Sequence, residues 1–395
     1  MAEDLGKTLL AEVEEVGLDE VRLQLLNTLR TRDDITPTYF GLSQLDRLIR
    51  TIVSSNSAVA KGTPPQPMVE LTSTASGGGK THILYCLTAL AVCPKSSGGR
   101  EACVVIFDTD GTFSVDRLAQ QIRKHLTTNR TTSNAEEHPD TDVDDIIFSC
   151  LKHVHIFRPQ SLASTIRTLE DLPSHLFDQT RHHSYDRVVG FIALDSASTF
   201  HWQTRSDEEE AALLASTEPH SPHHPPSSKP PNYQNLATAL RKATQTFSCP
   251  AIFTSRHLAP TPHPNTQGTD PRSLRPPLPA PLSQLPLLRL VVQRKRVRKF
   301  PVGMSITEAL HEADARQRAV EEGRFECVVN EWGMDERTVE RLLRSGGGGI
   351  GWGFRIGADG MEVEFDGQQG EEIGKKETIK QYSSAEDRDE QTVKR

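Results

Sequence analysis

A glycine-rich run between a strand-like segment and a helix-like segment constrains the fold of this chain more than any other feature. The run reads Thr74-Ala75-Ser76-Gly77-Gly78-Gly79-Lys80-Thr81. It follows the apolar segment Met68 to Leu71 and precedes a helical pattern over residues 82 to 92. In such a loop, backbone N–H groups point at phosphate oxygens, the lysine reaches the β- and γ-phosphates, and the threonine hydroxyl ligates Mg²⁺. The run therefore predicts a nucleotide-binding loop.

One position departs from the usual pattern G-x-x-x-x-G-K-[ST]. Its first glycine is replaced by Thr74, a β-branched residue that takes left-handed backbone conformations reluctantly. The glycines Gly77, Gly78 and Gly79 could restore the phosphate cradle, or the loop could be distorted. A plain surface loop is the alternative, and the flanking strand and helix patterns argue against it.

Apolar runs of strand length alternate with helical patterns over most of the chain, which predicts an α/β protein with a parallel sheet and crossover helices. The strand candidates are Met68–Leu71, Cys103–Phe107, Val154–Phe157, Val188–Leu194 and Ala251–Thr254, and the helix candidates include 82–92, Val115–Leu126, Leu162–Leu172 and 234–247. Beyond residue 287 the pattern changes to Leu288–Val292, Phe325–Val329, Gly353–Ile356 and Met361–Phe365. With Asp359-Gly360 as a hairpin turn, these segments predict an antiparallel edge on the same sheet.

Composition favours one core domain with disordered insertions. Hydrophobic residues make up 35% of the chain, and its 25 prolines cluster. We expect a helical N-terminal segment at 1–37, a core at 38–365 with insertions at 127–145, 203–232 and 258–286, and a disordered tail at 366–395. Six separated cysteines predict reduced core thiols, and the absence of a secretory start or an apolar stretch of about 18 residues predicts a soluble, intracellular protein. The net charge of −8 neither indicates nor excludes nucleic-acid binding.

Two carboxylate positions follow buried strand candidates. Asp195 ends the segment Val188–Leu194, where a phosphate-loop ATPase needs a carboxylate to hold Mg²⁺ through water. Asp110, within Asp108-Thr109-Asp110-Gly111-Thr112-Phe113, could polarise an attacking water. Equally, this Asp-Gly turn could simply precede a helix capped by Ser114.

Four motifs, taken in order, resemble those of the RecA-type recombinases and their eukaryotic repair paralogues. They are Gly41-Leu42-Ser43-Gln44-Leu45-Asp46, Gly79-Lys80-Thr81, Asp108-Thr109-Asp110-Gly111-Thr112-Phe113 and Leu194-Asp195-Ser196. The stretch Asp195 to Trp202 resembles the X-ray-repair cross-complementing branch in particular. The resemblance covers residues 38 to 365. It implies a RecA-like P-loop ATPase core, mainly a parallel sheet flanked by helices with an antiparallel C-terminal edge.

The resemblance also assigns roles to individual residues. Lys80 and Thr81 would hold ATP phosphates and Mg²⁺ beside Thr74 and Gly77 to Gly79, and Asp195 would support the metal. Asp110 stands where active recombinases keep a catalytic Glu; its shorter side chain would displace the carboxylate by roughly 1 Å, which can cost on the order of 10²-fold in rate. Arg256 stands where the family has a Gln that senses the γ-phosphate, and it could contact phosphate itself. Unlike the Gln carbonyl, its guanidinium cannot accept a hydrogen bond from water. These departures imply slow hydrolysis, at most that of a weak DNA-dependent ATPase.

The family places its DNA-binding loops at 203–232 and 257–286, and Phe200 and Trp202 could stack on bases or belong to the core. The basic run Arg294 to Lys299 could be a nuclear-import signal, a phosphate contact or a solvated turn. For His220, His223 and His224, disorder is favoured over metal binding. With only about 40 residues before the Gly41 motif, we expect no separate N-terminal DNA-binding domain.

Three functional readings follow. The first is DNA repair by homologous recombination in the nucleus, with ATP, Mg²⁺, single-stranded DNA at double-strand breaks and another RecA-type paralogue of the D type as partner. The second is a non-hydrolysing structural subunit with a vestigial nucleotide site. The third and weakest is an unrelated phosphate-loop kinase.

Overall fold

The computed structural model describes residues 38–55, 66–132, 143–217, 231–257, 273–295, 303–345 and 350–364. The predicted N-terminal helices, the C-terminal tail and the histidines at 220, 223 and 224 lie outside these ranges. Of the basic run, only Arg294 and Lys295 are described.

A nine-stranded sheet in the order β3-β2-β4-β5-β1-β6-β7-β8-β9 forms the centre of the molecule. The pairs among β1 to β5 and the β1–β6 pair are parallel, whereas β6–β7, β7–β8 and β8–β9 are antiparallel. The strands are β1 Met68–Ser73, β2 Cys103–Asp108, β3 Val154–Phe157, β4 Val189–Asp195, β5 Ala251–Arg256, β6 Leu288–Arg294, β7 Arg324–Val329, β8 Gly351–Gly357 and β9 Gly360–Val363. The predicted α/β class, with an antiparallel C-terminal edge, is confirmed.

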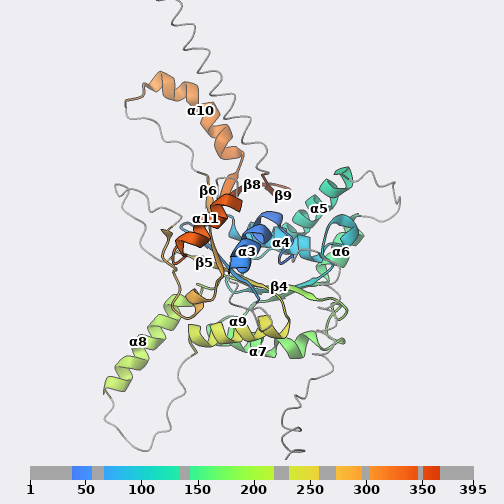
Figure 1. Cartoon of the computed structure of the whole chain (residues 1–395), viewed down its shortest axis with the longest axis vertical. Helices are drawn as coiled ribbons and strands as arrows, with labels where there is room; N and C mark the ends of the chain where they lie inside the picture. Colours follow the sequence, from blue (N-terminus) through green and yellow to red (C-terminus); the bar gives the residue numbers. More distant parts are fainter. Residues whose placement is uncertain are drawn as a thin grey trace, which may run out of the picture.

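Helices cover both faces of the sheet, and each face has its own apolar core (Figure 1). On one side lie α3 Ser43–Ser55, α4 Lys80–Val92, α5 Val115–Thr132 and α6 Val143–Leu151; on the other lie α7 Leu162–Leu176 and α9 Tyr233–Thr246. Strand β2 shows the alternation directly. Val104 and Ile106 belong to the first core, whereas Val105 and Phe107 belong to the second. A strand buried on both faces has to be apolar throughout, which explains the continuous apolar runs in the sequence.

The Gly41 to Asp46 motif fixes the chain entering α3. The sequence suggests Ser43 as the helix N-cap, but α3 begins at Ser43 itself. The main polar contact comes from Asp46, whose carboxylate accepts the backbone N–H groups of Tyr39, Phe40 and Gly41 at 3.2, 2.8 and 3.0 Å. Burial raises the pKa of Asp46, and these hydrogen bonds oppose that rise.

Parts of the segments expected to lack regular structure are ordered. Helix α5 continues to Thr132, into the expected 127–145 insertion, and α8, His201–Thr217, covers the first half of the expected 203–232 insertion. Exposed side-chain pairs four residues apart, such as Arg205–Glu209, support α8. The helix has no apolar face, so the sequence pattern did not indicate it. In the proline-rich segment, Leu274, Leu278 and Leu282 are buried, so the described part of that stretch packs on the core.

Two C-terminal helices were not anticipated from the sequence. Helix α10, Ile306–Glu321, begins with a capping box formed by Ser305 and Glu308, and α11 is Glu336–Ser345. A capping box is visible in sequence, and could have located α10. In Figure 1, α8 and α10 project away from the layered body.

The cysteines and the apolar helices bear on the predictions made from composition. All six cysteines are buried and none forms a disulfide, as expected of reduced core thiols. No helix in the described part of the chain is long and apolar enough to cross a membrane.

Candidate nucleotide site

The glycine-rich loop connects β1 to α4, and two of its glycines adopt the left-handed backbone conformations. Gly77 and Gly79 have φ values of 73° and 97°, whereas Thr74 does not have a positive φ. A Cβ at Gly78 would lie 2.8 Å from both the Cβ of Ser73 and the carbonyl oxygen of Val292. The replacement of the first glycine therefore demands no left-handed conformation from Thr74.

Lys80, the first residue of α4, points back at the end of β1. Its Nζ donates to Ser73 Oγ at 2.5 Å, and Ser73 Oγ donates to the Ala75 carbonyl at 2.8 Å. Burial lowers the pKa of Lys80, while the charges of Asp195 and Asp110 act in the opposite direction. Ser73 was missed by sequence reasoning because a strand-end serine carries no distinctive signal.

Asp195 lies at the carboxyl end of β4 and is buried. One carboxylate oxygen accepts the Thr81 hydroxyl at 3.0 Å, and the other accepts the Thr254 hydroxyl at 2.5 Å. Burial raises the pKa of Asp195, the Thr254 hydrogen bond lowers it, and the nearby Asp110 charge raises it again. The structure thus brings Asp195 to the adjacent residues Lys80 and Thr81, although the sequence places it 114 residues after Thr81.

The donor set fits Mg²⁺ held together with phosphates. A hydroxyl and a carboxylate are the oxygen ligands that Mg²⁺ prefers, and this ion commonly keeps waters and substrate phosphates in its shell. No group of three or more His, Cys, Asp or Glu residues in the described ranges could hold a metal ion. Thr81 and Asp195 would therefore supply only part of the coordination.

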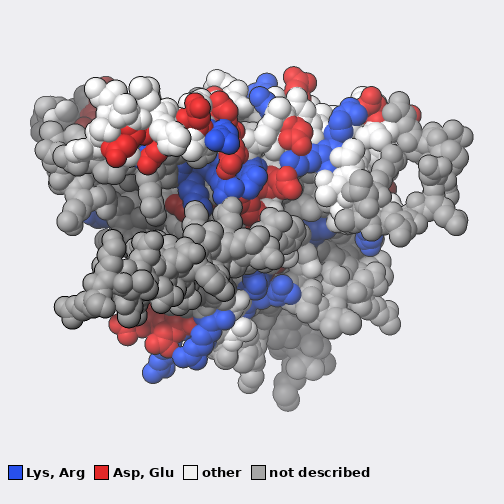
Figure 2. All heavy atoms as spheres, turned by 90° about the horizontal axis from the view of Figure 1, so that it is seen from above, with Lys and Arg blue, Asp and Glu red and all other residues white. Residues whose placement is uncertain are grey.

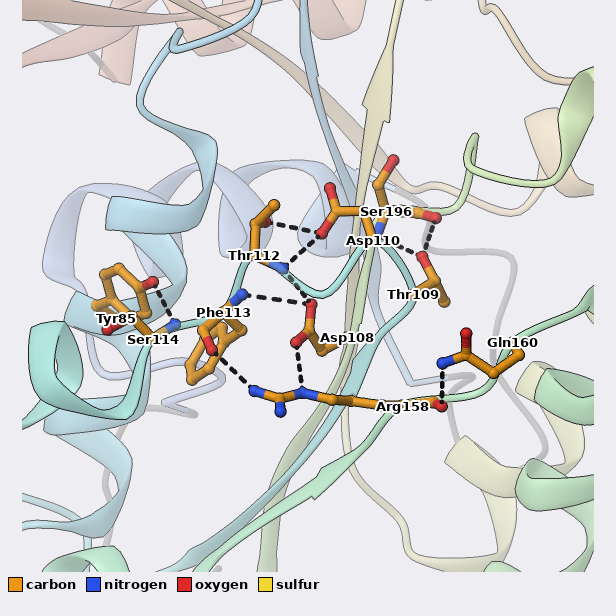
Figure 3. A network of polar contacts seen from close by, with 10 residues as sticks. All are labelled: Tyr85, Asp108, Thr109, Asp110, Thr112, Phe113, Ser114, Arg158, Gln160 and Ser196. Carbon is orange, nitrogen blue, oxygen red and sulfur yellow. Dashed lines mark hydrogen bonds and ion pairs between the residues drawn. The ribbon is translucent and has the colours of Figure 1, made fainter.

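Asp110 lies in the turn after β2, close enough for its charge to raise the pKa of both Lys80 and Asp195 (Figure 3). Its Oδ1 accepts the backbone N–H of Thr112 at 3.2 Å and the Thr112 hydroxyl at 2.7 Å. The cap of α5 is also present, since Ser114 Oγ accepts the Arg117 N–H at 3.3 Å. The cap predicted for α5 is confirmed, and the same turn places Asp110 near Lys80 and Asp195, whereas the role of Asp110 toward water stays a prediction.

Arg158 and Asp108 clamp this turn, and neither was assigned a role from the sequence. Asp108 accepts the N–H groups of Thr112 and Phe113 at 3.0 and 3.3 Å and Arg158 Nε at 3.0 Å. Arg158 Nη2 in turn donates to the Phe113 carbonyl at 3.3 Å. Figure 3 shows the guanidinium reaching across from β3 to the turn. The position of Asp110 is thereby fixed from both sides.

Arg256 ends β5 at the same edge of the sheet. Its side chain is exposed, and its charge is one of the influences that lower the pKa of Lys80. Its backbone N–H donates to Ser198 Oγ at 3.1 Å. The structure therefore brings every residue predicted for the site to the carboxyl ends of β1, β2, β4 and β5, where parallel sheets commonly bind ligands.

A cavity of about 230 Å³ opens beside the loop. Residues 77 to 82 form one wall, and Phe325 and Ile356 from the antiparallel edge form another. The rings of Phe325 and Phe354 stack with centroids 5.4 Å apart, and a Cβ at Gly79 would lie 3.1 Å from Phe354 Cζ. The sequence does not show this wall, because it depends on how β7 and β8 fold back beside β6, the neighbour of β1.

The two aromatic residues near Asp195 have different environments. Phe200 is partly buried against the second core, whereas Trp202, in the first turn of α8, is 58% exposed. Of the two, only Trp202 presents its ring to solvent.

An α/β fold with a phosphate loop, a strand-end carboxylate and a second acidic turn defines the class as a phosphate-loop protein of RecA-like fold. No protein-family profile matches the chain. It is 30% identical over 142 residues to the mouse (Mus musculus) "DNA repair protein XRCC2", covering 36% of this chain and 44% of that protein. It is also 34% identical over 73 residues to the mouse "DNA repair protein RAD51 homolog 2", covering 18% of this chain and 21% of that relative.

These similarities confirm the resemblance to RecA-type recombinase paralogues that the motifs indicated, including its X-ray-repair cross-complementing branch. The matched part spans less than half the length of either relative.

Proposed function

We propose that this chain is an ATP-binding recombinase paralogue that works in DNA repair by homologous recombination. It acts in the nucleus on single-stranded DNA at double-strand breaks, together with another RecA-type paralogue of the D type. The observation that carries the nucleotide part is the meeting of Lys80, Thr81 and Asp195 beside a glycine loop at the end of a parallel sheet. The repair part rests on the names of the two relatives.

Each residue of the site has a chemical role in this proposal. The N–H groups of the loop and the N-terminus of α4 face the phosphates, and Lys80 exchanges its contact with Ser73 for phosphate oxygens. Bound Mg²⁺ would neutralise phosphate charge. Asp195 orients the Thr81 hydroxyl toward that ion through the 3.0 Å hydrogen bond.

Hydrolysis is slow in this proposal. Asp110 has one carboxylate oxygen engaged by Thr112, and its side chain is shorter than the expected Glu. Arg256 offers positive charge at the sheet edge but cannot accept a hydrogen bond from water. The site suits retention of a nucleotide better than rapid turnover.

The alternative is a structural subunit that does not hydrolyse ATP, and the same two substitutions favour it. Asp195 fits both proposals, because the hydroxyl groups of Thr81 and Thr254 satisfy its buried carboxylate with or without a nucleotide. The phosphate-loop kinase has no specific observation in its favour.

Charge on the visible surface does not by itself indicate a DNA groove. On the face shown in Figure 2, the Lys and Arg side chains of the described residues are interspersed with Asp and Glu. The single-stranded DNA part of the proposal therefore rests on the similarity to repair proteins and on exposed Trp202, an aromatic ring on which a base could stack.

A titration with a fluorescent ATP analogue and Mg²⁺ tests the nucleotide site. Lys80→Ala should weaken binding at least tenfold, because a desolvated charge-assisted contact to phosphate contributes about 1.5–3 kcal/mol. Lys242→Ala, which removes an exposed lysine of α9, is the matched control and should bind like the unaltered chain. Equal binding by all three proteins would contradict the proposal.

Complementation separates the two main readings. In a repair-defective strain, loss of rescue by Lys80→Ala with normal folding and normal partner co-purification would support nucleotide-dependent repair. Full rescue by Lys80→Ala would favour the structural subunit.

A further inference from the structure

One hydroxyl group joins the turn that carries Asp110 to the segment that follows Asp195. Thr109 Oγ1 donates to the Ser196 carbonyl at 2.6 Å and accepts the Ser196 N–H at 2.8 Å (Figure 3). It also lies 3.1 Å from Thr199 Oγ1. A threonine hydroxyl has one donor and two acceptor positions, so these contacts use it fully.

The same segment is held from its other side by the end of β5. Ser196 Oγ and Ser198 Oγ lie 2.9 Å apart, and the Arg256 N–H donates to Ser198 Oγ at 3.1 Å. The Ala197 N–H donates to the Thr254 carbonyl at 2.8 Å. Residues 196 to 199 therefore contact both strand-end segments that carry the charged groups Asp110 and Arg256.

Helix α8 starts at His201, directly after this segment. The helix projects from the body of the molecule in Figure 1, and Trp202 in its first turn is 58% exposed. A displacement of residues 196 to 199 would be passed to the base of α8 within two peptide units. Trp202 is placed to report that displacement.

We propose that Thr109 is a positioning residue that couples the turn carrying Asp110 to the first turn of α8. The inference rests on the proposed function, since the event it transmits is the arrival of a polyphosphate beside Lys80. That charge repels Asp110 and attracts Arg256, and both residues are tied to residues 196 to 199. Occupancy of the nucleotide site thereby sets the position of α8.

Tryptophan emission tests the coupling. Addition of a non-hydrolysable ATP analogue with Mg²⁺ should change the emission of the full chain, and Trp202→Phe should remove that change, which assigns the signal. Thr109→Val, of the same shape without the hydroxyl, should reduce the change at least fivefold while nucleotide affinity stays within about threefold. Thr109→Ser should restore it. A merely structural role would not give rescue by serine at constant affinity.

Hydrogen exchange of the nucleotide-free chain gives a second measurement that does not depend on nucleotide binding. In Thr109→Val, amides of residues 196 to 204 and 109 to 113 should exchange about fivefold faster, and those of α7 should not change. Thr109→Ser should behave like the unaltered chain.

The two measurements distinguish the possible failures. Unchanged exchange in Thr109→Val, or a full emission change in that variant, would overturn the coupling even if the nucleotide binds. If the unaltered chain binds no nucleotide, the proposed function fails, and accelerated exchange in both segments would still support the link made by Thr109.

Discussion

Asp108 is a fully buried carboxylate whose cationic partner, Arg158, is 56% exposed. The carboxylate also accepts two backbone N–H groups of the turn that follows β2. Loss of the guanidinium would leave a buried charge with neutral partners only. At the scale of single residues, this ion pair is the support of the acidic turn.

Removal of Arg158 should therefore destabilise the protein. We expect Arg158→Ala to lower the free energy of unfolding by about 1–3 kcal/mol, less than for a fully buried pair because solvent screens the exposed guanidinium. Arg167→Ala, which breaks the exposed pair with Asp171, should cost under about 0.5 kcal/mol. Urea denaturation of both variants makes the comparison. Equal effects would show that the Asp108 pair is not a structural support.

At the scale of elements, β3 and the loop after α7 share a histidine cluster. His153 Nδ1 and His155 Nε2 lie 3.0 and 2.9 Å from Ser184 Oγ, which has a single hydrogen to donate and can therefore bond both rings only when at least one presents an N–H. The rings of His175 and His182 lie 5.7 and 4.9 Å from that of His155. Burial lowers the pKa of His153 and of His155 to about 4, and nearby positive groups, Arg187 for His153 and the other histidines for His155, add to it.

The cluster predicts a loss of stability in mild acid. A histidine whose folded pKa is depressed binds more protons when unfolded, so its contribution is complete above the unfolded pKa of 6.5 and declines as the pH falls toward 4. Urea midpoints of the unaltered chain at pH 7.5, 6 and 5 should fall faster than those of His155→Gln. Taking the difference removes the opposite contribution of buried carboxyls such as Asp46. Parallel curves would contradict the prediction.

At the scale of the whole molecule, the last strand of the antiparallel edge, β9, is held against α5 by the side chain of Gln121, in addition to its pairing within the sheet. Gln121 Oε1 accepts the Met361 N–H at 2.6 Å, and its Nε2 donates to the Met361 carbonyl at 3.1 Å. The amide thus pairs with β9 as a neighbouring strand would. This edge also supplies Phe325 and Ile356 to the wall of the nucleotide cavity.

Loss of this amide should loosen the edge. Gln121→Ala leaves two buried backbone groups without partners, and we expect a cost of about 2–4 kcal/mol in unfolding free energy. Gln120→Ala, at an exposed neighbouring position, should cost under about 0.5 kcal/mol. Hydrogen exchange should show faster opening of β9 than of β2 in the first variant. Uniform exchange across the sheet would contradict the attachment.

The sequence alone determined the elements whose signals are local. The glycine loop, the apolar strands and the acidic strand ends of β2 and β4 were predicted, because a strand buried on both faces must be apolar and a phosphate loop needs residues without side chains. Helices α8 and α10 were not predicted, because they are exposed and lack an apolar stripe that faces the core.

Which distant groups meet depends on strand order and register, which the sequence pattern does not reveal. The order β3-β2-β4-β5-β1 brings Asp195 to Thr81 and Thr254, Arg158 to Asp108, and Thr109 to Ser196. Because β7 and β8 fold back on β6, the rings of Phe325 and Phe354 lie against Gly79. None of these pairs has a sequence spacing that reveals it, since parallel neighbours in a sheet are joined by crossovers of variable length and a contact is set by strand order and register.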